Sequence, residues 1–102
     1  MRPIYIAQLD KARPVLVLTR SQVRPFLNNV TVAPITTTVR GLSTEVPVGK
    51  INGLNSECVI SCDNITTVPT SALARQIGML LPEQEPALTQ AILAAFDLED
   101  GF

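Results

Sequence analysis

Three places in this chain carry side chains able to act on a charged substrate. Arg13 stands at the entrance of the apolar run Val15–Leu18, and three threonines (36–38) stand at the end of a second apolar run, Val30–Ile35. Asp63 and Asn64 follow a third apolar stretch. A planar guanidinium and hydroxyl donors can align a charged group and stabilise negative charge that develops on it. If the first two runs are neighbouring strands, the guanidinium and the hydroxyls meet at one rim of a sheet.

Each of these groups also has an ordinary structural interpretation. An arginine before a strand is usually solvated, threonines favour strands, and an Asp-Asn pair is typical of a turn. The chain contains no histidine, which excludes Ser-His-Asp and Cys-His catalysis and imidazole acid–base pairs. It has no glycine-rich phosphate loop, no paired-cysteine zinc motif and no interleaving of basic and aromatic residues for stacking bases. The residues alone leave the choice between site and structure open.

Composition predicts a single domain over residues 1–102. With 46% hydrophobic and 17% charged residues, the chain has the character of a compact globule with an aliphatic core. No apolar run approaches the roughly 18 residues that span a bilayer. Met1-Arg2-Pro3 leads directly into a strand-like run, so we expect no signal peptide. These features predict a cytoplasmic protein that does not enter a membrane.

Charge is distributed unevenly along the chain. Residues 1–40 carry six basic side chains against one acid, whereas residues 41–102 carry two against eight. This asymmetry suggests a side of the protein that faces a polyanion. The two cysteines, Cys58 and Cys62, would lie about 13 Å apart on a strand at ~3.3 Å per residue, which is too far for a disulfide. They are expected to be buried free thiols, and two thiolates are too few for a structural zinc site.

Short strands separated by turns are expected over most of the chain. Strands are predicted over 4–9, 13–19, 30–36, 44–48, 58–62, 65–68 and 76–80. A tight hairpin with Asp10 and Lys11 at its tip joins the first two, and Asn52-Gly53 is a strong turn signal. Pro47 cannot donate a ladder hydrogen bond, so either its strand lies at a sheet edge or Pro47 is the unpaired position of that strand. Ser21 is expected to cap a short helical turn that Pro25 ends.

One amphipathic helix is expected after these strands. Pro82 suits its first position. Leu88, Ile92, Ala95 and Phe96 fall on one apolar stripe, and the helix should end near Asp97. The predicted fold class is therefore mainly β or α+β, a small, barrel-like or strongly bent antiparallel sheet with a C-terminal helix.

Several blocks of the chain, taken in order, resemble the MazF/PemK/Kid toxins. They cover most of the chain from Tyr5 to Leu80 and are Arg13–Arg20, Val32–Thr36, Arg40–Pro47, Asn52–Leu54, Cys62–Ile65 and Gln76–Gly78. Within the family the chain looks most like a shortened type seen in mycobacteria. The resemblance implies a bent, SH3-like barrel that forms a homodimer. It also implies the toxin of a bacterial type II toxin–antitoxin pair that causes growth arrest and is held inactive by a cognate antitoxin.

The resemblance further implies a sequence-specific, metal-independent endoribonuclease that needs no cofactor. Arg13 and Thr36 match the family's active-site arginine and threonine, which would align the scissile phosphate of mRNA or tRNA for attack by the ribose 2′-hydroxyl. Asp63 and Asn64 match a position that acts as acid or base in some members and contacts an RNA base in others. Lys11 and Thr37 are further candidates for RNA binding through phosphate.

The chain departs from the family in the loop between its first two strands, where relatives carry a longer segment and only Asp10-Lys11-Ala12 stands here. It also has Thr66 where many members have arginine, and it lacks a histidine that some use. The shorter loop predicts a more open site and makes folded tRNA a plausible substrate. Two rival interpretations stay open, a topoisomerase-binding toxin like CcdB on the same fold and a catalytically lapsed RNA-binding member.

Overall fold

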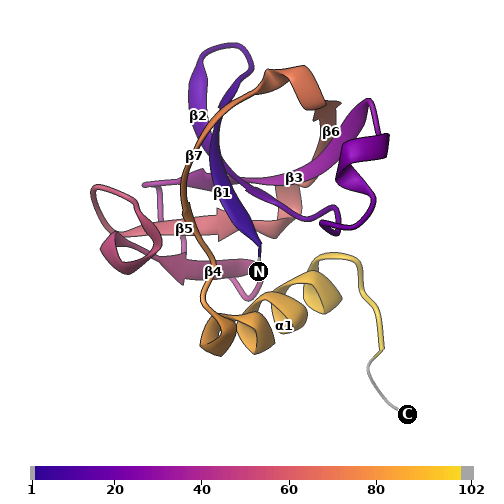
Figure 1. The fold of residues 1–102 in the computed structure, drawn as a ribbon. Coiled ribbons are helices and arrows are strands. Elements are labelled where there is room, and N and C mark those ends of the chain that lie inside the picture. The colour runs from indigo at the N-terminus through magenta and orange to yellow at the C-terminus, as the bar shows by residue number, and fades with distance from the viewer. Residues whose placement is uncertain (1, 100–102) are drawn as a thin grey trace.

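The computed structural model describes residues 2–99 and shows a strongly bent antiparallel sheet with one α-helix packed beneath it (Figure 1). Within these residues the strands are β1 (Pro3–Gln8), β2 (Ala12–Val17), β3 (Asn29–Thr36), β4 (Glu45–Val48), β5 (Cys58–Ser61), β6 (Thr66–Pro69) and β7 (Leu73–Met79). Short 3₁₀ helices are η1 (Arg24–Phe26), η2 (Lys50–Asn52), η3 (Cys62–Asn64), η4 (Thr70–Ala72) and η5 (Pro82–Gln84), and the α-helix is α1 (Glu85–Ala95).

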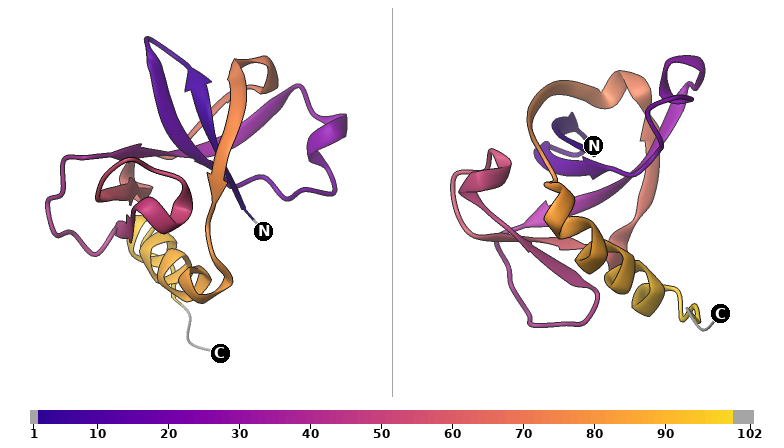
Figure 2. Two further views of the ribbon diagram at one scale, coloured as in Figure 1. Left: turned by 60° about the vertical axis from the view of Figure 1, so that its left-hand side comes forward. Right: turned by 60° about the horizontal axis from the view of Figure 1, so that its bottom comes forward.

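The sheet is organised around β3, which is long enough to pair with three other strands. Its middle pairs with β2, its first half with β6, and its last residues with β5. The strand order is β4-β5-β3-β2-β1-β7, with β6 beside β3. The predicted mainly-β class with a C-terminal helix is confirmed. The described strands do not close into a ring, however, so "barrel" describes the curvature of the sheet (Figures 1 and 2).

Strand β2 is buried on both faces, as the unbroken apolar run predicts. Val15 and Val17 pack in one hydrophobic cluster together with β3 and β6, whereas Leu16 packs in a second cluster together with β4, β5 and α1. All three side chains are 0% exposed. The buried second half of β2 therefore lies between two hydrophobic cores.

Two other strand predictions are also confirmed. The hairpin between β1 and β2 is tight, since Gln8 pairs with Ala12. Strand β4 lies at the edge of the sheet, with the side chain of Pro47 exposed. An edge tolerates proline because its missing N–H leaves no ladder bond unmade. The turn at Asn52-Gly53 is present as well, with Gly53 at a φ of 90°.

The helical predictions need three corrections. Ser21 does not cap the short helix, because η1 begins at Arg24 with Val23 at its N-cap position and no side-chain cap. Pro25 does not end a helix but lies within η1, because a proline fits the first turn of a helix, where its missing N–H is not needed. In α1, Leu88 and Ala91 are buried and Ile92 and Ala95 pack beside them. Phe96, assigned to the apolar stripe by spacing, is 55% exposed because α1 ends at Ala95. Among residues 2–99, no helix is long and apolar enough to cross a membrane.

Both cysteines are buried free thiols, as predicted. Burial, together with the neighbouring charge of Asp63, raises the pKa of Cys62 from 9.0 to about 11. Because the pKa of Cys62 is higher in the folded than in the unfolded protein, the contribution of the neutral thiol to stability is complete below pH 9. This contribution is lost as the pH rises toward 11. We expect the free energy of unfolding to fall by about 2 kcal/mol by pH 10.5, relative to Cys62→Ala over the same interval. Urea denaturation of both proteins at pH 8 and pH 10.5 measures this, and parallel losses would contradict it.

Candidate active site

A pocket of about 440 Å³ lies where the start of β2, the end of β3 and the start of β4 come together. We call it the Arg13 pocket. Its lining residues are Arg13, Pro34, Thr36, Thr38, Arg40, Leu42, Glu45, Ser61, Asp63 and Asn64. Four of the residues predicted from the sequence, Arg13, Thr36, Asp63 and Asn64, therefore share one pocket. They come from three separate parts of the chain.

The antiparallel register of β2 and β3 explains why Arg13 and Thr36 meet. Val15 pairs with Pro34, and continuing this register by two residues brings Thr36 opposite Arg13. Thr36 also pairs with Val59 of β5, so the chain turns away from β2 at this point. The pocket opens where β3 passes from one neighbour to the other. Two largely buried strands thus present polar side chains at their shared end.

The guanidinium of Arg13 is oriented by Asp10 at the tip of the hairpin. Its Nε and Nη2 donate to Asp10 Oδ1 and Oδ2 at 3.1 and 3.2 Å. These bonds hold the pKa of Asp10 below its ordinary value of 3.8, so the carboxylate stays ionised and paired at neutral pH. An arginine side chain has five N–H donors, and this fork uses two of them. Three N–H donors remain for the oxygens of a bound anion.

Thr36 keeps its hydroxyl proton for a ligand. Its Oγ1 accepts the backbone N–H of Thr38 at 3.1 Å, a bond that fixes the position of the oxygen and leaves the O–H without an assigned acceptor. Thr36 is partly exposed. A fixed hydroxyl with a free proton beside a guanidinium with three free N–H groups forms a donor set suited to a phosphoryl group.

The acidic side chains of the pocket are already engaged in holding its loops. The Glu45 carboxylate accepts the backbone N–H groups of residues 40, 41 and 42 at distances between 2.9 and 3.4 Å. Asp63 Oδ2 accepts the hydroxyl of Thr44 at 2.6 Å, and Asn64 donates to Ser61 Oγ at 2.9 Å. These carboxylates repel an incoming anion less than free ones, and they keep the β3–β4 loop and η3 at the rim.

Two predicted RNA-binding residues lie outside this pocket. Lys11 is exposed at the tip of the hairpin, and Thr37 lines a different hollow with Ile6, Arg75 and Gln76. Sequence reasoning missed Asp10 as the partner of Arg13, although their spacing of three residues across a tight hairpin was a usable signal. It also missed Arg40 and Glu45 as lining residues, because only folding of the β3–β4 loop brings them to the pocket.

The family assignment comes from comparison with known proteins. The family model described as the PemK-like, MazF-like toxin of type II toxin–antitoxin systems matches residues 3–96. The chain belongs to this toxin family. The resemblance seen in the sequence blocks is therefore confirmed, and it extends over nearly all of this MazF-like toxin.

Individual relatives agree with this assignment. Endoribonuclease MazF3 of Mycobacterium tuberculosis is 71% identical over 99 residues, which cover 97% of this MazF-like toxin and 96% of that protein. The solved structure of Mycobacterium tuberculosis toxin MazF-mt6 superimposes with a TM-score of 0.94 at 70% identity, covering 96% of this chain and 99% of that one. A mycobacterial endoribonuclease solved with its cognate antitoxin shares the fold, with a TM-score of 0.85 at 24% identity over 97% of this chain and 95% of that one.

Proposed function

We propose that this MazF-like toxin is an endoribonuclease that cuts mRNA or tRNA at a specific sequence without a metal ion or cofactor. The observation that carries the proposal is the pairing of Arg13 with Thr36 in one pocket, both with free hydrogen-bond donors. The 71% identical relative, MazF3 of Mycobacterium tuberculosis, is also named an endoribonuclease. Because the substrate is cellular RNA, we expect the protein to act in the bacterial cytoplasm.

In the proposed reaction the ribose 2′-oxygen attacks the adjacent phosphorus and the bond from phosphorus to the 5′-oxygen breaks. The 2′-hydroxyl loses its proton and the departing 5′-oxygen gains one, so the products are a 2′,3′-cyclic phosphate and a 5′-hydroxyl end. Negative charge builds on the two non-bridging oxygens during the step. The free edge of the Arg13 guanidinium and the Thr36 hydroxyl would stabilise that charge and hold the phosphate in line for attack. Asp63 and Asn64, at the rim of the pocket, would contact the RNA there.

The direct test is incubation of the purified protein with total RNA in EDTA, followed by mapping of new 5′-hydroxyl ends. Ends that share a sequence motif are the expected result. Intact RNA from a folded protein would favour one of the two rivals, the CcdB-like topoisomerase-binding toxin or the lapsed RNA-binding member. The names of the relatives favour the nuclease over the first rival. A supercoiling assay with topoisomerase would identify that rival directly.

The short hairpin before Arg13 bears on the choice of substrate. The tip of the β1–β2 hairpin is formed by Leu9, Asp10 and Lys11 alone, so no long loop covers the Arg13 pocket from this side. An open pocket admits a folded RNA such as tRNA. Cleavage of folded tRNA and of an unstructured oligomer of equal sequence should proceed at similar rates. A clear preference for the oligomer would contradict this.

A cognate antitoxin and a second copy of the chain are the proposed protein partners. The family of type II toxins, to which the chain belongs, supports the antitoxin. We propose that an acidic, partly disordered antitoxin segment covers basic surface formed by residues 1–40, which the structure places at two ends of β2. We also propose a homodimer, which sedimentation of the purified toxin tests directly.

Thr36→Val should reduce cleavage by about 10- to 100-fold, because valine keeps the shape of threonine and removes one donor to the phosphoryl oxygen. The substitution also removes the acceptor of the Thr38 N–H, but this hydrogen bond is exposed, so water can replace it and folding should be unaffected. Thr36→Ser is the matched control and should retain most of the activity. Cleavage rates at saturating RNA measure both variants, and equal rates for wild type and Thr36→Val would remove Thr36 from the catalytic pair.

A further inference from the structure

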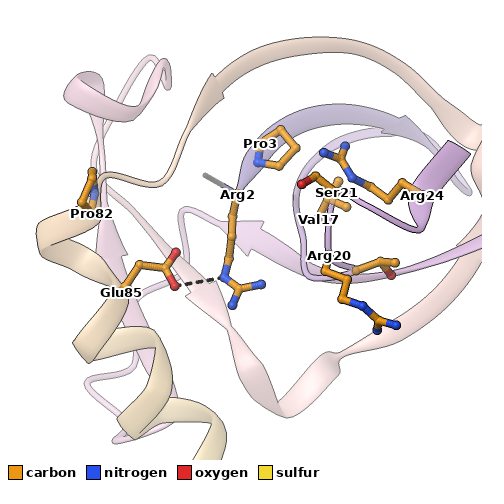
Figure 3. Close-up of a pocket in the computed structure, with 9 residues that line it drawn as sticks. Arg2, Pro3, Val17, Arg20, Ser21, Arg24, Pro82 and Glu85 are labelled. Carbon is orange, nitrogen blue, oxygen red and sulfur yellow. Dashed lines mark hydrogen bonds and ion pairs between the residues drawn. The ribbon is translucent and has the colours of Figure 1, made fainter.

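A second basic pocket lies beyond the other end of β2, away from the Arg13 pocket. It has a volume of about 330 Å³ and is shown in Figure 3. We call it the Arg24 pocket. Three arginines (2, 20 and 24) and two hydroxyl residues, Thr19 and Ser21, line it with Pro3, Val17, Pro82 and Glu85. Glu85 is its one acid, so three guanidinium groups stand against one carboxylate.

Only Arg2 has its charge balanced within the pocket. Its Nε donates to Glu85 Oε1 at 3.2 Å and its Nη1 to the carbonyl of Leu18 at 3.0 Å. Figure 3 shows this ion pair on one side of Arg2, with Arg20 and Arg24 on the other. Within residues 2–99 the ion pairs are those of Arg2 and Arg13. The charges of Arg20 and Arg24 are therefore unpaired in the described part of the chain.

Arg24 has an additional feature that points to a ligand. Its Nε is buried and lacks a hydrogen-bond acceptor, and among the buried side-chain polar atoms described it alone has none. Leaving a buried donor unsatisfied is costly, more so when the donor is charged. Buried polar groups in native proteins are nearly always paired, so such a donor calls for a specific explanation. In Figure 3 the Arg24 guanidinium extends toward Pro3 and Ser21, which line the same pocket.

We propose that the Arg24 pocket binds a phosphate group of the RNA backbone at a point remote from the cleaved bond. The proposal rests on the endoribonuclease function proposed above. Arginine is the side chain best suited to the planar, multiple hydrogen bonds that phosphate accepts. Arg13 lines one pocket and Val17 lines the other, and the four residue steps of β2 between them correspond to roughly 13 Å at ~3.3 Å per residue. The two pockets thus contact different nucleotides of the same RNA.

The surroundings of Arg24 favour a backbone phosphate over a free anion. Arg24 also lines a neighbouring hollow of about 300 Å³ with Tyr5, Pro25, Val30, Thr70 and Leu73. A phosphate held by Arg24 therefore has space beside it for an attached nucleoside. Contacts of this kind set affinity and salt dependence and carry no sequence information. The Arg24 pocket would hold the RNA while the Arg13 pocket selects and cuts it.

The first measurement probes the pocket without RNA. Inorganic phosphate is titrated into ¹⁵N-labelled protein while the Nε–H signal of Arg24 is followed by NMR. The signal should shift with saturation at millimolar phosphate, and Arg20→Gln should weaken the binding severalfold. The control Lys50→Gln removes an exposed positive charge elsewhere and should leave the titration unchanged. Absence of any phosphate-dependent shift would overturn the proposal.

The second measurement uses RNA that is 2′-O-methylated throughout, which the proposed reaction cannot cleave. Its affinity is determined over a range of salt concentrations. Arg20→Gln/Arg24→Gln should bind at least fivefold more weakly, with a slope of log K against log salt smaller by about 0.7, the value for one phosphate contact on a single strand. Arg24→Lys keeps the charge but removes the buried Nε–H. If the double variant does not fold, RNA binding is measured with Arg24→Lys in its place. Lys50→Gln should match wild type in both quantities.

An unchanged slope in a folded double variant would overturn the proposal. Unchanged RNA binding with loss of antitoxin binding would also overturn it, because the pocket would then belong to an acidic protein segment. Neither measurement depends on cleavage. Failure of the proposed nuclease function would appear as intact total RNA in the EDTA assay, and failure of the Arg24 pocket as wild-type binding here.

Discussion

Arg13→Ala is expected to reduce RNA cleavage by about 10²- to 10³-fold and to abolish growth arrest, while the protein stays folded. Loss of one preorganised donor to developing negative charge has this magnitude in other enzymes. Arg13 supplies both charge and geometry here, because Asp10 holds one edge of its guanidinium and leaves the other edge free. The Arg13 side chain is 43% exposed and that of Asp10 is 71% exposed, so the ion pair contributes little to stability. Folding and activity can therefore be separated.

Two further variants show which property of Arg13 matters. Arg13→Lys keeps the positive charge but loses the planar fork, and it should recover only a small part of the activity. Asp10→Asn keeps the guanidinium and loosens its orientation, so its loss should be smaller than that of Arg13→Ala. Rates at saturating RNA, with circular dichroism as the folding control, rank the three. Wild-type activity in Arg13→Ala would show that the active site lies elsewhere.

Gly78→Ala is expected to destabilise the protein by at least ~3 kcal/mol, enough to leave much of it unfolded. Strand β7 is irregular here, since Ile4 pairs with Gly78 while Tyr5 pairs with Gln76, which leaves Ile77 as an extra residue. The bulged strand presses against the turn that follows η2. A Cβ on Gly78 would overlap the carbonyl group of Asn52, and a Cβ on Gly53 would overlap that of Ile77. Each added Cβ would collide with backbone atoms, which cannot move aside as a flexible side chain could.

The side chain of Asn52 locks the same contact. It is 1% exposed, its Nδ2 donates to Met79 O at 3.0 Å and to Gln84 Oε1 at 2.6 Å, and its Oδ1 accepts the N–H of Gly49 at 3.1 Å. Displacing the turn would break these buried bonds as well, which adds to the cost. The absence of a side chain at position 78 and the buried amide at position 52 are thus both required for the close contact between β7 and the turn after η2.

Gly41→Ala is the matched control for Gly78→Ala. Gly41 has a φ of 73°, but an added Cβ would meet nothing within 4 Å. Its substitution should therefore cost only the backbone strain, about 1 kcal/mol. Urea denaturation of the two variants separates strain from collision. If Gly78→Ala were no less stable than Gly41→Ala, the close approach of η2 to β7 would not limit stability.

This contact between β7 and the turn after η2 changes the interpretation of two of the sequence blocks. Asn52–Leu54 and Gln76–Gly78 resemble family motifs, and no local pattern connects them. In the structure they touch, and Asn52 and Gly78 are needed for packing. The sequence marked Asn52-Gly53 as a turn, and it is one. The burial of Asn52 could not be predicted, because it depends on β7 and η5 arriving from later in the chain.

The basic half of the chain shows a similar division. Composition showed that positive charge concentrates in residues 1–40, and it suggested one face toward a polyanion. The structure separates that charge into two pockets at opposite ends of β2, one with Arg13 and Arg40 and one with Arg2, Arg20 and Arg24. The length of β2 decides this separation, since its five residue steps carry its two ends roughly 17 Å apart at ~3.3 Å per residue.

Local chemistry alone determined several elements of this protein. Four apolar residues in a row made β2 a strand buried on both faces, and the short Asp10-Lys11 tip required a tight hairpin. Pro47 restricted β4 to a sheet edge or to an unpaired position, and the edge is what the structure shows. Each of these features depends on residues adjacent in the sequence, so the local sequence pattern is enough to predict it. The tertiary structure decided the rest. Arg13 and Thr36 lie opposite each other because of the register between β2 and β3, and register is set by long-range packing that no local pattern contains.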